Sequence, residues 1–219
     1  TIITILIGLV VPGLNQLRFF ARKVAQLKQF QTIGSALHLF NAEWQDYPRS
    51  SSGYSGATEL AKAMVGEDLK GYSIFNNYEE PIDLSSRRLY LPPANSNAHR
   101  LRDLYEGLDD VDAKRPILCD VYPYAMDTGI GMPILYYRAN TAARSMSEIY
   151  NYADNEMLVG LGTPWAPGES HRLDEARFYE QIQNKRVDLP WTPQRMDSFI
   201  LMSAGVDGEY GTEDDLFNF

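Results

Sequence analysis

The sequence predicts an α+β protein in which a long N-terminal helix packs on a globular head with a small antiparallel sheet and short helices. The first 17 residues carry no charged side chain. Apolar residues then recur at steps of three and four as far as Trp44, which is helical periodicity. Beyond residue 46, short runs rich in Ile, Leu, Val and Tyr are bounded by Pro, Gly and Asn, as is typical of strands. We therefore expect two parts, a helix over 1–45 and a head over 46–219, the head being long enough to bury a core.

The first half of the predicted helix is almost a membrane span. A spanning helix needs about 20 apolar residues, so the uncharged run from Thr1 to Leu17 is slightly short. The alternative is the core of a signal peptide, but no small-residue cleavage site follows, and we expect the segment to be retained. Gly8, Pro12 and Gly13 predict a kink or local unwinding here, because proline lacks a backbone donor and glycine costs backbone entropy.

The second half of the helix carries an apolar stripe, and the rest of its surface is polar or basic. A single helix from Thr1 to Trp44 would be roughly 65 Å long, so half of it must project beyond the head. We expect the second half to be a core helix. The stripe consists of Phe20, Val24, Leu27, Phe30, Ile33, Leu37, Phe40 and Trp44.

The head should begin after a linker at 46–53, because Pro48 disfavours helix at Tyr47 and the serine run has no apolar face. Within the head, helical patterns cover 58–65, 98–106 and 173–182, and strand patterns cover 117–122, 134–139 and 198–203.

Charge is divided unevenly between the two parts. Residues 1–45 carry a net charge of +3, and residues 46–219 carry −12. The overall charge of −9 disfavours binding to phosphate backbones, so we expect no nucleic-acid partner. The two parts are suited to different surroundings.

The sequence lacks the common catalytic motifs. It has no phosphate-binding loop, no zinc-protease motif and no nucleophile elbow, and its three histidines, at 38, 99 and 171, lie on separate segments. Cys119 is the single cysteine, which excludes an internal disulfide, and it fits best as a small buried side chain. We expect no catalytic residues and no enzyme activity.

An acidic, glycine-rich segment lies near the C-terminus, at 203–215. Its glycines, Gly205, Gly208 and Gly211, allow the backbone to turn several oxygen atoms toward one point. Hard oxygen ligands on such a loop suit Ca²⁺, and closely spaced like charges repel unless a cation or open water screens them. A solvated acidic turn is the alternative. The predicted calcium ligands are Asp207, Glu209, Asp214 and Asp215.

These features together resemble the type IV pilin-like proteins, and among them the major pseudopilin of type II secretion systems. The apolar run that ends at Leu9-Val10-Val11-Pro12 is similar to the pilin assembly helix, and the Tyr47-Pro48 turn is similar to the start of the pseudopilin head. The segment 203–215 resembles the family's S-A-G-x-D-G-x-x-G-T-x-D-D calcium loop. The resemblance does not extend to 53–195, and the family's hallmark opening, a peptidase site followed by phenylalanine and an early glutamate, is absent.

The resemblance implies a structural subunit. Such a subunit is held in the cytoplasmic membrane by its apolar helix and then enters a helical filament, periplasmic or extracellular, with helices in the core and heads outside. Its partners would be further copies of itself, other pilin-like subunits, the assembly machinery and, before assembly, the membrane. Ca²⁺ would bind in the C-terminal loop. The expected assembly helix includes Ile5, Leu6, Ile7, Leu9, Val10, Val11, Pro12, Leu14, Phe20, Val24 and Leu27.

Two other functions remain open. The head could belong to a membrane-anchored hydrolase or a carbohydrate-binding adhesin, in which case we expect turnover of a glycan or ester that is lost on changing Asp120 or Asp127. An aromatic platform for a sugar could be formed by Trp165, Trp191, Tyr136 and Tyr137. The large head also suits a tip subunit that initiates assembly or adheres.

Overall fold

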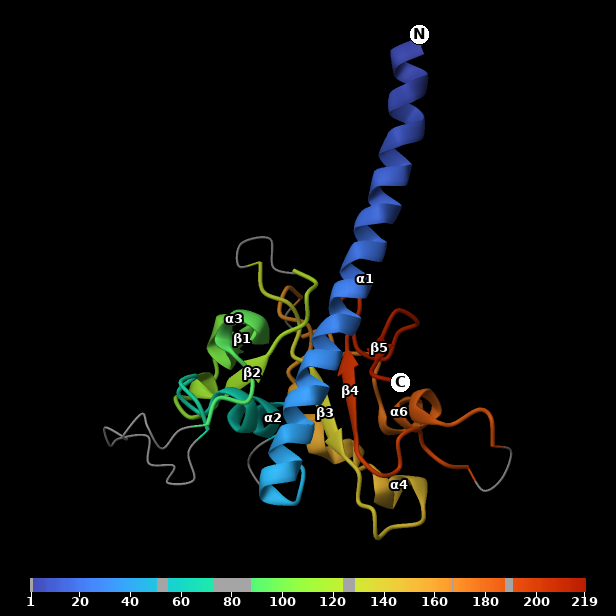
Figure 1. Ribbon diagram of the computed structural model, residues 1–219. Helices are drawn as coiled ribbons and strands as arrows, with labels where there is room; N and C mark the ends of the chain where they lie inside the picture. Colours follow the sequence, from blue (N-terminus) through green and yellow to red (C-terminus); the bar gives the residue numbers. More distant parts are fainter. Residues whose placement is uncertain (1, 51–54, 73–87, 124–128, 167, 188–190) are drawn as a thin grey trace.

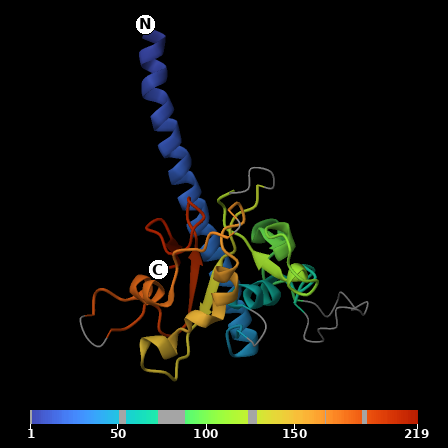
Figure 2. The ribbon, with the colours of Figure 1, turned by 180° about the vertical axis from the view of Figure 1, so that it is seen from behind.

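The computed structural model describes residues 2–50, 55–72, 88–123, 129–166, 168–187 and 191–219, and the side chains of these residues except 2–13, 15 and 93 (Figure 1). The protein is α+β, as the sequence predicts. A long helix stands clear of the head at its N-terminal end, and the other elements gather around its C-terminal half (Figures 1 and 2).

The long helix is α1 (Ile2–Trp44). It ends where Gln45 adopts a positive φ of 59°, and its N–H still bonds to Asn41 O at 2.7 Å. The helix is unbroken through Gly8, Pro12 and Gly13, so the kink or unwinding expected there is not observed. Proline removes a single backbone donor, and the neighbouring turns keep the rest of the hydrogen-bond ladder. All side chains from residue 16 to residue 25 are exposed, as expected for a projecting half.

The apolar stripe of α1 does not face one environment. Its later members Phe30, Ile33, Leu37 and Phe40 are buried, which confirms the core helix, whereas Phe20 is 66% exposed and other early members are also exposed. The eight stripe residues are spaced by about 3.4 residues on average, which is shorter than the helical repeat of 3.6. The stripe therefore winds slowly around the helix. Its first members are exposed because they lie on the part of α1 that projects from the head, where all side chains from 16 to 25 are exposed.

The sheet beneath α1 is antiparallel, with strand order β3 (Leu135–Arg138), β4 (Phe199–Ser203) and β5 (Leu216–Phe217). Both faces of β3 and β4 are covered, because alternate residues belong to two different apolar clusters. This explains why the strands at 134–139 and 198–203 are almost wholly apolar, and both predicted strands are confirmed. The side chains on the α1 face are Tyr136, Phe199 and Leu201, and those on the opposite face are Leu135, Tyr137, Ile200 and Met202.

A second, two-stranded sheet joins β1 (Ala98–Arg100) and β2 (Pro116–Leu118). The prediction of a helix over 98–106 is therefore wrong, and only a 3-10 turn at Leu101–Asp103 remains of it. Pairing with β2 provides hydrogen-bond partners for the backbone of 98–100, and an isolated helix of this length is only marginally stable. The strand predicted at 117–122 is shorter than expected, ending at 118 with an isolated bridge from Cys119 to Pro133.

The remaining helices are short and lie on the head. Ser55 caps α2 (Gly56–Val65) by accepting a hydrogen bond from Thr58 N, and Asp174 caps α6 (Glu175–Ile182) in the same way from Arg177 N. Both helices were predicted from the sequence. The others are α3 (Pro93–Ser96), α4 (Met146–Ile149), α5 (Glu156–Gly160) and 3-10 turns at Asp112–Lys114 and Tyr152–Asn155.

Candidate functional site

The acidic segment forms the connection between β4 and β5. Met202 pairs with Phe217, and Ser203 pairs with Leu216, so residues 204–215 leave the sheet and return to it as one closed loop. The antiparallel ladder fixes the two ends of the loop, which brings the carboxylates at its beginning close to those at its end.

Glycine is required where this loop folds back on itself. Gly205, Gly208 and Gly211 all have positive φ, between 70° and 89°, a conformation that other L-residues adopt at a cost. A Cβ at Gly205 would lie 2.2 Å from the carbonyl oxygen of Asp214, and one at Gly211 would lie 2.4 Å from Leu173 N. The expected role of the glycines as turning points is therefore observed.

Asp214 closes the loop from inside. Its Oδ2 accepts hydrogen bonds from Val206 N at 2.5 Å and Asp207 N at 3.0 Å, and its Oδ1 accepts one from Thr212 Oγ1 at 2.6 Å. Burial acts to raise the pKa of Asp214, but these donors outweigh it and hold the pKa below the usual value. Asp214 is therefore ionised at neutral pH and presents a fixed negative charge inside the loop.

The carboxyl group of Asp207 faces that of Asp214. Its pKa is raised, first by burial and then by the charge and contact of Asp214, although a hydrogen bond from Glu209 N at 2.8 Å opposes the rise. Two facing carboxylates repel each other, and a cation between them would relieve the repulsion. The pair is the part of the loop best suited to hold a cation.

Asp215 links the loop to α6. Its Oδ2 accepts hydrogen bonds from Gly211 N and Thr212 N, each at 2.8 Å, and from Gln181 Nε2 at 2.7 Å. Burial raises its pKa to about 7 in spite of these donors. Its Oδ1 is buried and has no hydrogen-bond partner among the described residues. This free oxygen is a further potential ligand for a cation.

Glu209 is turned away from the aspartate pair. Its carboxylate forms an ion pair with Arg172 Nε at 3.1 Å. The structure thus brings Asp207 and Asp214 together. One oxygen of Asp215 bonds to the loop backbone and to Gln181, and Glu209 pairs with Arg172.

Within the part of the chain that the structure describes, no group of three or more His, Cys, Asp or Glu side chains is arranged to hold a metal ion. Of the four predicted ligands, the structure brings the carboxyl groups of Asp207 and Asp214 together.

Residues far away in the sequence support the loop, and no local sequence pattern predicts their role. Tyr210 N donates to His171 Nδ1 at 3.2 Å, and the two rings meet edge to face with centroids 4.6 Å apart. Burial lowers the pKa of His171 to about 4, so the ring is neutral at pH 7 and can accept this bond. No local pattern marks His171, because it lies 39 residues from Tyr210.

Asp120 anchors the start of the loop. It is fully buried, and its carboxyl oxygens accept hydrogen bonds from Tyr122 N at 3.1 Å, Met132 N at 3.2 Å and Ser203 Oγ at 2.8 Å. Ser203 Oγ in turn accepts a hydrogen bond from Gly205 N at 3.3 Å. Burial raises the pKa of Asp120 to about 8. A carboxyl group enclosed in this way braces the structure and is not open to a substrate.

The residues suggested for a sugar platform are divided between core and surface. Tyr136 and Tyr137 are buried in the two apolar clusters, so they cannot form an exposed platform, whereas Trp165 and Trp191 are exposed. Asp127 lies outside the described residues. Cys119 is buried, as predicted, and burial raises the pKa of its thiol well above the usual value.

The projecting half of α1 forms a second candidate site. We define the α1 stripe as Leu17, Phe20, Val24 and Leu27, which follow one another at steps of three, four and three and are all exposed. Leu14 is also exposed. The assembly-helix residues at 5–12 belong to the backbone of α1, and their side chains lie outside the described residues. No helix in the described ranges meets the length and hydropathy needed to span a bilayer.

Comparison with family models, with curated proteins and with solved structures gives no match to this chain.

Proposed function

We propose that the chain is a structural subunit of a pilin-like helical filament, a pseudopilus or surface pilus, with its helices bundled in the core and its acidic heads outside. The observation that carries this proposal is the exposed α1 stripe, whose first three members lie on the half of α1 that projects from the head (Figure 1). Leu17 is 67% exposed, Phe20 66% and Val24 62%. Before assembly, the same helix would be held in the cytoplasmic membrane.

The exposed stripe is costly for an isolated chain in water. Full burial of a large apolar side chain stabilises by about 1.5–3 kcal/mol, so the four stripe residues together represent several kcal/mol per copy. Exposed apolar surface of this kind marks a site of association with protein or lipid. Helices of further copies would cover the stripe, and head-to-tail contact between different patches gives an open polymer.

The charge distribution supports the same arrangement. The exposed basic residues of the projecting half, Arg18, Arg22 and Lys23, contrast with the net charge of −12 on residues 46–219. Attraction between the basic helix of one copy and the acidic head of another would favour their contact. The packing of the second half of α1 on the sheet also agrees with a pilin-like head.

Ca²⁺ would stabilise the head through the C-terminal loop. The facing pair of Asp207 and Asp214 and the free Oδ1 of Asp215 support this part of the proposal. The cation would add its own charge at a point where two carboxylates repel, and it would tie the start of the loop to its end.

Electron microscopy of the 219-residue chain, released from detergent, tests the filament. Val24→Asp should abolish assembly, because it places a charge in the stripe. Val111→Asp is the matched control, since Val111 is also exposed, at 63%, but lies on the head. Filaments of Val24→Asp as abundant as those of the parent chain would refute the proposal.

Thermal unfolding of the same chain in detergent, with Ca²⁺ or with a chelator, tests the metal. We expect a higher midpoint with Ca²⁺, and loss of this shift in Asp207→Asn. Glu213→Gln removes one charge from an exposed position in the same loop and should keep the shift. A midpoint that does not respond to Ca²⁺ in the parent chain would leave a solvated acidic turn as the correct description.

A further inference from the structure

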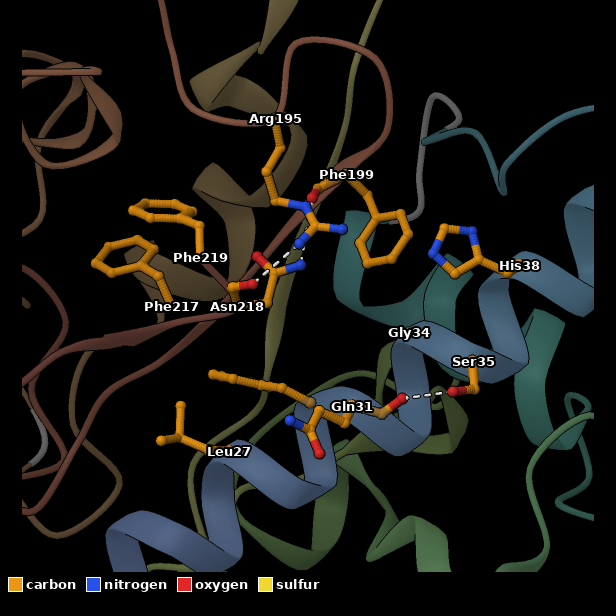
Figure 3. Close-up of a pocket in the computed structure, with 11 residues that line it drawn as sticks. Leu27, Gln31, Gly34, Ser35, His38, Arg195, Phe199, Phe217, Asn218 and Phe219 are labelled. Carbon is orange, nitrogen blue, oxygen red and sulfur yellow. Dashed lines mark hydrogen bonds between the residues drawn. The ribbon is translucent and has the colours of Figure 1, made fainter. Parts of the chain in front are cut away.

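A groove of about 600 Å³ lies between α1 and the C-terminal segment (Figure 3). The residues that line it include one cation, Arg195, and no aspartate or glutamate, although the whole chain has a net charge of −9. Sites for small ligands typically enclose about 300–1,000 Å³ and combine apolar walls with a few well-placed polar groups. The groove has this size and composition, and its lining is positively charged in a protein that is otherwise acidic.

Arg195 is held in place on the side of the groove opposite α1. Its Nη1 donates to Asn218 O at 3.0 Å, and its guanidinium lies over the ring of Phe199, 5.3 Å from the centroid. Figure 3 shows the side chain extending into the middle of the group of lining residues. In the described part of the chain Arg195 forms no ion pair with a carboxylate. A guanidinium has five N–H donors in a planar fork that matches a carboxylate, so the remaining donors suit an anionic group on a ligand.

The α1 wall of the groove presents a row of polar side chains. Gln31, Ser35 and His38 follow one another at steps of four and three, so they share one face of the helix, and all three are exposed. Ser35 Oγ donates to Gln31 O at 2.9 Å and can still accept a hydrogen bond, and His38 uses Nδ1 with Tyr47 Oη at 3.0 Å, which leaves Nε2 for a ligand. An amide, a hydroxyl and an imidazole in a row can each exchange hydrogen bonds with the hydroxyl groups of a ligand.

The backbone of this wall has little to offer an extended peptide. Grooves that bind extended peptides commonly pair with the peptide main chain through the free edge of a sheet. The N–H and C=O groups of α1 are used within the helix, because the segment lies well inside the range Ile2–Trp44. A ligand that bonds through hydroxyl groups therefore fits this wall better than an extended peptide does.

The C-terminal segment adds an aromatic surface. The rings of Phe217 and Phe219 stack with centroids 5.1 Å apart, and Phe219 is 47% exposed. An exposed aromatic ring can pack against the apolar C–H face of a sugar ring, whose hydroxyl groups then remain free at the edge. The groove thus combines a cation, a row of polar side chains and an exposed aromatic ring.

From this combination we infer that the groove binds an acidic sugar, namely a uronic acid or a short oligomer of one. The carboxylate pairs with Arg195, the hydroxyl groups bond to Gln31, Ser35 and His38, and the C–H face of the ring packs on Phe219. A neutral sugar has no anionic group for the arginine. The inference goes beyond the proposed filament and does not depend on it, because every group of the site comes from one chain.

Isothermal titration calorimetry of the 219-residue chain in detergent tests the site. The probe is trigalacturonate, and its methyl ester is the matched probe without charge. We expect the acid to bind at least tenfold more tightly than the ester, because only the acid can form a charge-assisted pair with the guanidinium. Equal affinities for the two probes, or no binding of the acid to the parent chain, would overturn the inference.

Substitution of the arginine tests its role. Arg195→Gln should weaken binding of the acid at least tenfold and leave binding of the ester nearly unchanged. Arg144→Gln is the matched control, since Arg144 is exposed and does not line the groove, and it should bind both probes as the parent chain does. Binding of the acid that is as tight in Arg195→Gln as in the parent chain would show that the carboxylate lies elsewhere.

A pair of variants at Gly34 tests the location without removing a proposed contact. A Cβ at Gly34 would lie 3.7 Å from Phe199 Cζ, an ordinary contact, so Gly34→Ala should fold and keep binding. Gly34→Leu should reduce binding of both probes at least tenfold, because its larger side chain enters the groove. Both variants should unfold at or above the midpoint of the parent chain, since each removes a glycine from the helix. Undiminished binding by Gly34→Leu would overturn the location.

An acidic peptide tests the class of ligand. The tripeptide Glu-Leu-Glu supplies carboxylates and an apolar side chain but no hydroxyl groups, so we expect it to bind at least tenfold more weakly than trigalacturonate. Phe219→Ala should weaken binding of the acid and of the ester by the same factor, because both use the same ring face. Binding of the peptide as tight as that of the sugar would show that the groove recognises acidic peptides, and the assignment to sugars would be wrong.

Discussion

Replacing Gly205 by alanine tests whether the C-terminal loop is closed by the contact of its two ends. The new Cβ would lie 2.2 Å from Asp214 O and 2.6 Å from Asp214 Oδ2, and the residue would keep a φ of +70°. The φ alone costs about 1 kcal/mol for a residue with a Cβ. The clash adds to this cost, because Asp214 must move and its three hydrogen bonds, from Val206 N, Asp207 N and Thr212 Oγ1, would be lost or weakened.

Bonds to a charged acceptor contribute about 1.5–3 kcal/mol each, and less where solvent can replace them, so we expect a total cost of about 3–5 kcal/mol. For a chain of this size, this corresponds to a fall of about 10 °C in the unfolding midpoint. The assay is thermal unfolding followed by circular dichroism, with the full chain in detergent and chelator present.

Gly107→Ala is the control for the backbone term. Gly107 has a φ of +75°, but a Cβ there would meet nothing within 4 Å. Gly107→Ala should lower the free energy of unfolding by only about 1 kcal/mol, which corresponds to a fall of about 2–4 °C in the midpoint. Equal losses in the two variants would refute the reasoning, because they would show that the ends of the loop are not in contact.

Two further predictions concern the core. Asp120 keeps its proton up to a pKa of about 8 in the folded state and releases it near 3.8 when unfolded, so its contribution to stability is present below pH 4 and is lost between pH 4 and 8. Asp120→Asn should remove this decline in stability, which is at most about 1.4 kcal/mol per pH unit. The measurement is the unfolding midpoint of the parent chain and of the variant from pH 4 to pH 8. If the midpoints of the two chains changed with pH in parallel, the result would contradict the assignment to Asp120. Phe30→Ala should cost about 3–5 kcal/mol of stability because Phe30 is buried in the core, whereas Phe20→Ala should change stability by less than about 0.5 kcal/mol. Denaturant unfolding of the two variants measures the difference. Similar losses in both would contradict the placement of Phe20 on a half of α1 that projects from the head.

Local patterns in the sequence correctly identified several elements. The helix up to Trp44, α2, α6 and the strands β3 and β4 were found because periodicity, caps and strand-forming residues act over a few neighbouring positions. The role of Gly205, Gly208 and Gly211 as turning points was anticipated for the same reason, and the structure gives all three a positive φ. The helix expected over 98–106 failed because its partner strand, at 116–118, is not visible in a local pattern.

Tertiary contacts decided the rest. The hydrogen bond between Asp120 and Ser203 joins residues 83 positions apart, and the one between Tyr210 and His171 joins residues 39 positions apart. No local spacing rule could therefore connect Asp120 or His171 to the loop. The eight-residue apolar stripe from Phe20 to Trp44 was evident in the sequence. Only the position of the head decides which of its members are buried, and it leaves Phe20 and Val24 exposed. The sequence by itself determined a long apolar helix, its end and an acidic glycine-rich loop, since these depend on the order of neighbouring residues. Only the tertiary structure decided which carboxylates face each other and where a groove remains beside the helix, because both depend on segments that are distant in the chain and adjacent in space.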